Sequence, residues 1–219
     1  MTAFNFEQAR YNMIEQQIRP WEVLDQRVLD TIACVPREDF VPERYRNLAF
    51  GDVAIPIGHG EFMLKPNVEG RLLQALAVRP TDHVLEVGTG SGYLTACLAR
   101  LAASVVSVDI VPDFVEAARQ KLKTHRLSNA ALHVGDAGRG WGERRYDAIA
   151  VTGSVAAVAD HWRQSLCPGG RLFVVAGQPP LMEALLITRI GEGEWLRESL
   201  FDTYLPPLRN SVTAKAFVF

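Results

Sequence analysis

The most informative stretch of this sequence reads Val84-Leu85-Glu86-Val87-Gly88-Thr89-Gly90-Ser91-Gly92-Tyr93. Residues 83–87 predict a buried strand, and residues 93–101 have helical character. In α/β sheets, a glycine turn between a strand and a helix binds nucleotide-like ligands. Glycines at 88, 90 and 92 permit a tight turn and let a ligand approach the backbone without a Cβ atom in the way.

The residues around these glycines exclude two common phosphate-binding motifs. A dinucleotide fingerprint that begins at Gly88 needs a glycine at position 93, where this sequence has Tyr93. A P-loop ends in Gly-Lys-Ser or Gly-Lys-Thr, and the turn contains no lysine. We therefore expect the turn to bind an adenosyl ligand with no requirement for phosphate.

Acidic residues at or near the ends of three predicted strands support a cofactor site, although each alone is also explained as a loop or helix-capping residue. Asp109 ends a strand and can accept hydrogen bonds from both ribose hydroxyls. Asp136 can accept one from an adenine amine, and Glu86 can order the turn or meet a ligand ammonium group. The predicted cofactor-binding residues are Glu86, Gly88, Thr89, Gly90, Gly92, Asp109, Ile110, Asp136 and Ala137.

The pattern of elements changes near Pro80. Before it, apolar residues at helical spacing predict helices around 13–18, 28–33 and 68–76, and the proline- and glycine-containing segment 53–66 is expected to be an irregular loop. After it, strands alternate with helices. We expect strands at 83–87, 105–109, 131–134, 146–151 and 171–175, helices at 93–101, 112–125 and 160–166, and strand-like stretches at 185–190, 199–205 and 212–219.

This alternation predicts an α/β fold with a Rossmann-like, mostly parallel sheet and an antiparallel strand at one edge. Residues 1–80 are expected to form an N-terminal helical cap with an acceptor loop, and residues 81–219 a cofactor-binding core. Because 219 residues suit one ordinary domain, the two parts are expected to form one compact unit.

Composition excludes several classes of protein. Apolar residues make up 48% and charged residues 22%, which excludes disordered and collagen-like chains. The net charge of −2, with acidic and basic residues interleaved, gives no reason to expect a nucleic acid or a membrane as partner. The histidines are scattered without metal-ligand spacing, so no metal is predicted.

Cysteine usage and the N-terminal residues indicate a cytoplasmic, soluble protein. Cys34, Cys97 and Cys167 are widely spaced with no CxxC pair, which suits a reducing compartment, and we expect them to be small buried residues. Residues 1–20 lack the apolar run of a signal peptide, and no apolar run approaches the ~20 residues that span a bilayer.

Several stretches, taken with the glycine turn, resemble one family. Leu166-Cys167-Pro168-Gly169-Gly170-Arg171-Leu172 resembles the turn into the fifth strand of class I S-adenosylmethionine-dependent methyltransferases. The blocks Val35-Pro36-Arg37-Glu38-Asp39-Phe40-Val41-Pro42 and Ile55-Pro56-Ile57-Gly58 resemble the protein-L-isoaspartate O-methyltransferases, and this likeness runs from about residue 11 to the end. The resemblance implies a seven-stranded sheet, S-adenosylmethionine as cofactor and carboxyl methylation of isoaspartyl residues in damaged proteins.

The acceptor loop departs from that family. Where the family reads Gly-Gln-Thr-Ile-Ser-Gln-Pro, this chain has Gly60-Glu61-Phe62-Met63-Leu64-Lys65-Pro66. The active-site serine of the family falls on Leu64, and its threonine on Phe62. Glu61 repels a carboxylate acceptor unless Lys65 or another cation neutralises it, and Lys65 can itself replace a lost contact. Glu61, Leu64 and Lys65 are therefore the candidate catalytic residues of the acceptor site, with His59 nearby.

Three functions are compatible with these residues. The first is methylation of isoaspartyl residues in proteins or peptides, for which the absence of a His–Asp pair is no objection, since an ionised carboxylate needs no general base. The second is methylation of a different acceptor, such as an unidentified small molecule. The third is a cofactor-binding regulatory module without turnover. Leu64 and Phe62 separate the first function from the other two, and the sequence leaves the oligomeric state open.

Overall fold

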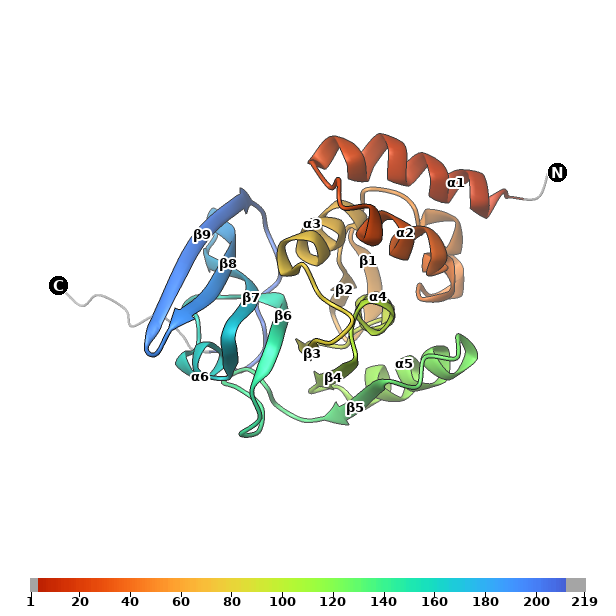
Figure 1. Ribbon diagram of the computed structural model, residues 1–219. Helices are drawn as coiled ribbons and strands as arrows, with labels where there is room; N and C mark the ends of the chain where they lie inside the picture. Colours follow the sequence, from red (N-terminus) through yellow and green to blue (C-terminus); the bar gives the residue numbers. More distant parts are fainter. Residues whose placement is uncertain (1–3, 212–219) are drawn as a thin grey trace.

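Strand β3 (His83–Val87) lies in the interior of a seven-stranded sheet. A computed structural model describes residues 4–211 and places the strands in the order β5-β4-β3-β6-β7-β8-β9 (Figure 1). Strand β3 pairs in parallel with its neighbours β4 and β6, and the pairs β4–β5 and β6–β7 are also parallel. The remaining strands are β4 (Ser104–Asp109), β5 (Ala130–Val134), β6 (Tyr146–Val155), β7 (Leu166–Gln178), β8 (Leu181–Gly191) and β9 (Glu194–Asp202).

Strand β8 runs antiparallel to both β7 and β9, so the antiparallel pairing lies at one edge of a mostly parallel sheet. This arrangement confirms the predicted α/β class and the seven-stranded sheet. Strand β9 begins at Glu194 rather than near residue 199. The expected strand over 212–219 lies outside the described residues.

Helices connect the parallel strands. Helix α4 (Tyr93–Leu101) follows β3 as predicted, and α5 (Pro112–Thr124) follows β4. Helix α6 (Asp160–Gln164) is shorter than expected because β7 already begins at Leu166, which pairs with Tyr146 before the Pro-Gly-Gly turn is reached.

The N-terminal part is largely helical, as predicted. Helix α1 (Phe6–Met13) continues through a π-helical turn, Ile14–Ile18, and a 3-10 turn, Arg19–Trp21. Helix α2 (Gln26–Cys34) begins where Asp25 accepts a hydrogen bond from the Arg27 amide, at 2.8 Å. Two 3-10 helices, Arg37–Asp39 and Glu43–Leu48, and helix α3 (Pro66–Leu76) follow in the chain. Figure 1 shows α1 and α2 beside α3, away from the β8–β9 edge.

The segment 53–66 is not an irregular loop, and that expectation was wrong. It contains an antiparallel hairpin of β1 (Ile55–Gly58) and β2 (Glu61–Met63). The two turn residues, His59 and Gly60, both have positive φ, at 53° and 79°, which a tight two-residue hairpin turn requires. The prolines and glycines that suggested an irregular loop therefore build the turn and flank the pairing.

Two apolar layers pack on the sheet, and the three cysteines differ in burial. One layer joins the N-terminal helices to α3, α4 and the sheet, and the other surrounds Trp162 of α6. Cys97 is buried in the first layer, Cys167 is half-buried and Cys34 is exposed. The expectation of three buried cysteines was therefore wrong for Cys34. No helix within residues 4–211 is both long and apolar enough to cross a membrane.

A buried arginine fastens the hairpin to this core. Arg37 is fully buried; its Nε atom donates to the Ala49 carbonyl at 2.8 Å and its Nη2 atom to the Leu64 carbonyl at 2.6 Å. Its Nη1 atom forms an ion pair with Glu69, and its guanidinium lies 4.7 Å from the centre of the Tyr93 ring. Burial raises the pKa of Glu69 to about 7, although Arg37 opposes the rise.

Replacing Arg37 should therefore destabilise the fold strongly. Arg37→Met leaves Glu69 buried without its partner, which costs about 3–5 kcal/mol in the free energy of unfolding. Urea denaturation followed by circular dichroism measures the loss. Arg119→Met is the matched control, because the Arg119–Glu116 pair is exposed and its removal should leave the midpoint unchanged. Equal midpoints for the two variants would show that Arg37 is not an anchor.

Candidate functional site

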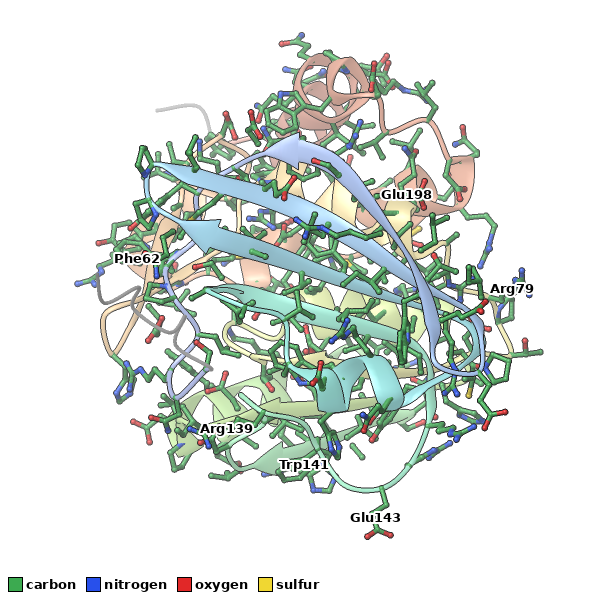
Figure 2. All side chains as sticks on the ribbon, turned by 90° about the vertical axis from the view of Figure 1, so that its left-hand side faces the viewer. Phe62, Arg79, Arg139, Trp141, Glu143 and Glu198 are labelled. Atoms are coloured by element: carbon green, nitrogen blue, oxygen red, sulfur yellow. The ribbon has the colours of Figure 1, made fainter. Side chains whose placement is uncertain are left out.

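A cleft opens at the carboxyl ends of the parallel strands, where α/β sheets bind their ligands. The β1–β2 hairpin and a segment that follows β9 form its other walls. Phe62 on the hairpin and Arg139 after β5 lie on the same side of the molecule (Figure 2). The lining residues include Ile57, Glu61, Phe62, Leu64, Gly88, Gly90, Asp109, Ile110, Asp136, Ala137, Thr152 and residues 206–209.

The glycine turn presents bare backbone to this cleft. Gly88 and Gly90 have φ values of +97° and +49°, and a Cβ atom on Gly88 would lie 2.1 Å from the Thr152 hydroxyl oxygen. Thr152 Oγ1 in turn lies 3.0 Å and 2.9 Å from the carbonyl oxygens of Val87 and Gly88, to which it donates. Gly92 does not line the cleft. It is the N-cap residue of α4, with φ +83°, and lies close to Ala118.

Asp109 fixes the turn from the neighbouring strand. Its Oδ2 atom accepts from the Gly90 amide at 2.8 Å, and its Oδ1 atom from the Val111 amide at 2.9 Å. Burial raises the pKa of Asp109, and these backbone hydrogen bonds oppose the rise. Since each carboxylate oxygen can accept two hydrogen bonds, both atoms can still receive ligand hydroxyls. Ile110 lines the cleft beside it and is partly exposed.

Asp136 and Ala137 line the cleft after β5. Ala137 is buried, whereas Asp136 is exposed and accepts from the Gly138 amide at 2.9 Å through Oδ1. Its Oδ2 atom accepts from the Asn210 side chain at 3.0 Å. Asn210 was not predicted, and each Asp136 oxygen keeps the capacity to accept one further hydrogen bond.

Glu86 and Thr89 lie beneath the turn rather than in the main cleft. Glu86 is fully buried, and its Oε2 atom accepts from the hydroxyls of Thr95 and Ser107, at 2.5 Å and 2.6 Å. The Ser107 hydroxyl also lies 2.6 Å from that of Thr89. The Oε1 atom of Glu86 is buried with no partner among residues 4–211, and burial raises the pKa of this carboxyl to about 8. Glu86 and Thr89 line a smaller adjoining pocket, which shares Gly88, Gly90 and Leu64 with the cleft.

Of the three candidate acceptor-site residues, the structure brings Glu61 and Leu64 to the cleft but not Lys65. Lys65 is exposed and lies 3.8 Å from Asp52. The cation that meets Glu61 is Arg209, whose Nη2 and Nε atoms lie 2.7 Å and 2.9 Å from Glu61 Oε1. Sequence reasoning missed Arg209, because nothing in the pattern relates two residues 148 positions apart.

Little of the N-terminal part lines the cleft. The residues of the N-terminal part that line the cleft or its adjoining pocket come from the hairpin, from Leu64 after it, and from Glu69 of α3. Helices α1 and α2 contribute none of the lining. Within the described residues, no three His, Cys, Asp or Glu side chains gather in a group that could hold a metal ion.

Comparison with known proteins identifies the family. The sequence profile described as protein-L-isoaspartate(D-aspartate) O-methyltransferase matches residues 8–210. The chain belongs to the protein-L-isoaspartate O-methyltransferase family. The family's enzymes are S-adenosylmethionine-dependent and act in protein repair, so this chain is a methyltransferase of that family.

Two relatives illustrate the similarity. The protein-L-isoaspartate O-methyltransferase of Magnetococcus marinus is 36% identical over 203 residues, 92% of this chain and 89% of that protein. Protein-L-isoaspartate O-methyltransferase 1 of Anaeromyxobacter sp. is 40% identical over 189 residues, which cover 85% of this chain and 89% of that protein.

Solved structures support the fold. A Plasmodium falciparum protein, described as a protein-L-isoaspartate O-methyltransferase in complex with S-adenosyl-L-homocysteine, superimposes with a TM-score of 0.81 at 21% identity. The match covers 95% of this chain and 100% of that one. A second structure of a protein-L-isoaspartate O-methyltransferase gives a TM-score of 0.76 at 22% identity and covers 93% of this chain and 65% of that one. At these identities the likeness concerns the fold alone.

The buried carboxyl of Glu86 should make stability fall as pH rises. Its pKa is about 8 in the native state against 4.5 as the ordinary value, so the native state binds more protons between these limits. The contribution is complete below about pH 4.5 and is lost as pH rises through about 8. Glu86→Gln should flatten the fall in the free energy of unfolding measured between about pH 5.5 and about pH 7.5. The raised pKa values of Glu69 and Asp109 leave a residual slope in the variant. An unchanged slope would contradict a raised pKa at Glu86.

Proposed function

We propose that this protein methylates the free carboxylate of isoaspartyl residues in proteins and peptides, with S-adenosylmethionine as methyl donor. The observation that carries the proposal is the position of the hairpin. It brings the loop equivalent to the family's acceptor loop, Glu61 to Leu64, to the same cleft as the glycine turn and Asp109. A ligand held by the turn would therefore face a protein or peptide that enters beside the hairpin.

The residues of the turn fit an adenosyl amino acid. Asp109 retains acceptor capacity for ribose hydroxyls, and Ala137 leaves space beside Asp136 for a base. The Oε1 atom of Glu86, which has no partner in the described part of the chain, suits a ligand ammonium group, since an unpaired buried oxygen is costly until it gains a donor. Gly88 and Gly90 have no Cβ atom, so a ligand can approach their backbone closely. Their positive φ angles would strain any other residue at either position.

S-adenosylmethionine, when bound, supplies an electrophilic methyl group on a sulfonium centre. One oxygen of the acceptor carboxylate bonds to the methyl carbon while the carbon–sulfur bond breaks, and the bonding pair stays on sulfur. No proton moves, so the protein needs only to position the acceptor and to exclude water. Phe62 and Leu64 suit the exclusion of water, because they give the acceptor side of the cleft an apolar surface.

The same reasoning assigns different tasks to the two parts of the chain. In this proposal residues 1–80 supply the acceptor side through the hairpin, and residues 81–219 hold the cofactor. The buried contacts of Arg37 with Leu64 and Glu69 support the assignment, because they fix the hairpin to the core.

A different acceptor is the second candidate, and one observation favours it. Phe62 and Leu64 replace two hydroxyl residues of the family's acceptor loop, and both line the cleft. A site without these hydroxyls loses hydrogen bonds that orient a carboxylate, at a cost of about 1–3 kcal/mol if nothing replaces them.

Asp109 should dominate cofactor affinity. Asp109→Asn removes the charge that strengthens hydrogen bonds to ribose hydroxyls, and we expect S-adenosylhomocysteine to bind roughly tenfold to hundredfold more weakly. Calorimetric titration measures the affinity. Asp30→Asn, an exposed substitution on α2, serves as control and should bind like the wild type. Wild-type affinity in the Asp109 variant would show that Asp109 does not bind the cofactor.

A matched pair of peptides tests the acceptor. Labelled methyl groups should pass from S-adenosylmethionine to an isoaspartyl peptide and not to its aspartyl counterpart. Leu64→Ser should raise the rate about tenfold, because it restores a hydroxyl that can orient the carboxylate. If neither peptide is labelled while S-adenosylhomocysteine still binds, a different acceptor becomes the better assignment.

A further inference from the structure

Arg209 differs in charge from the other described residues around the cleft. Among residues 4–211 it is the one basic side chain that lines the cleft or the adjoining pocket. The acids Glu61, Asp109 and Asp136 line the same cleft. A carboxylate that enters this cleft therefore meets three acids and a single cation.

The contacts of Arg209 leave part of its guanidinium available. Its Nη2 atom donates to the His59 carbonyl at 2.7 Å and also lies 2.7 Å from Glu61 Oε1. Its Nε atom donates to the same Glu61 oxygen. Its Nη1 atom makes no hydrogen bond within the described part of the chain. Among residues 4–211 the guanidinium thus has unused donors, and its planar shape matches a carboxylate.

The ion pair with Glu61 is suited to exchange. The side chain of Arg209 is 47% exposed and that of Glu61 is 30% exposed, so water and salt weaken their attraction. One carboxylate can replace another at an arginine without leaving an unpaired buried charge. Glu61 stands where the family has a neutral glutamine. This chain therefore has both a cation, Arg209, and a carboxylate that forms an ion pair with it.

The backbone around Arg209 is held independently of Glu61. The Leu208 amide donates to the Ser154 carbonyl at 2.8 Å, and the Ser154 amide donates to the Pro206 carbonyl at 2.9 Å. The Ser154 hydroxyl donates to the Leu205 carbonyl at 2.8 Å. Loss of the Glu61 contact therefore does not release this segment from β6, and it leaves the Arg209 side chain with the His59 carbonyl as its remaining partner among residues 4–211.

We propose that Arg209 binds the acceptor carboxylate, and that Glu61 holds its guanidinium until the acceptor displaces it. This inference rests on the proposed function and names the residue that takes over from the serine replaced by Leu64. Arg209 would hold one carboxylate oxygen and leave the other free to accept the methyl group. Glu61 would then act as a competitor that disfavours weakly bound acceptors.

Two substitutions that break the same ion pair distinguish this role from a purely structural one, in which the Arg209–Glu61 pair only holds the hairpin against the segment after β9. Arg209→Gln should raise the KM for an isoaspartyl peptide about tenfold, because it removes a charge-assisted contact. Glu61→Gln should lower that KM about threefold, because it removes the competing carboxylate. The same peptide, labelled with a fluorophore, should show the same opposite shifts in affinity for enzyme saturated with S-adenosylhomocysteine. If the ion pair were purely structural, both variants would weaken peptide binding.

Controls separate the possible failures. Arg197→Gln breaks another exposed arginine–glutamate pair, that with Glu183, and should leave the KM unchanged. Undiminished S-adenosylhomocysteine binding by each variant shows that the fold and cofactor site are intact. If the wild type methylates the peptide while both variants shift the KM in the same direction, or Arg209→Gln does not shift it, the role of Arg209 is overturned and the proposed function stands. If the wild type neither binds nor methylates the peptide, both proposals fail.

Discussion

The buried guanidinium of Arg37 is the constraint on which the relation between the two sides of the cleft depends. It contacts the carbonyl of Leu64, the carboxylate of Glu69 and the ring of Tyr93, which belong to the hairpin connection, α3 and α4. A fully buried charge is tolerated only when its donors are satisfied, so these segments can adopt few other arrangements. The hairpin side of the cleft therefore has a defined position relative to the turn after β3.

A second polar cluster defines the turn itself. Glu86, Thr95, Ser107 and Thr89 join β3, α4, β4 and the loop through their hydroxyls and one carboxylate oxygen. Asp109 completes the cluster from β4 through the Gly90 amide. Together they hold a backbone conformation that residues with side chains rarely adopt. One Glu86 oxygen has no partner among residues 4–211, which supports the proposal that a donor group of the ligand meets it.

The sequence predicted those features whose signal is local. Strand β3 and helix α4 had the expected bounds because a buried run and a helical run meet at glycines. The hairpin was missed because Pro56, Gly58 and Gly60 are typical of loops, and only cross-strand pairing shows that they flank a tight turn. The roles of Thr152, Arg209 and Asn210 were missed because each depends on a contact between distant parts of the chain. Lys65 was chosen as a nearby cation, yet it lies beside Asp52.

The contacts proposed for Glu86 with the ligand's amino group and for Asp109 with its ribose have a consequence for turnover. S-adenosylmethionine and S-adenosylhomocysteine share the ribose and the amino-acid end and differ only at sulfur. Groups that bind only the shared parts stabilise donor and spent donor alike, so they add affinity without distinguishing substrate from product. In an enzyme built this way, the spent donor competes with fresh donor, and its departure limits the cycle once methyl transfer is fast. Any preference for the donor would then have to come from groups that face the sulfur, which the proposed function assigns to the side of the cleft where the hairpin lies.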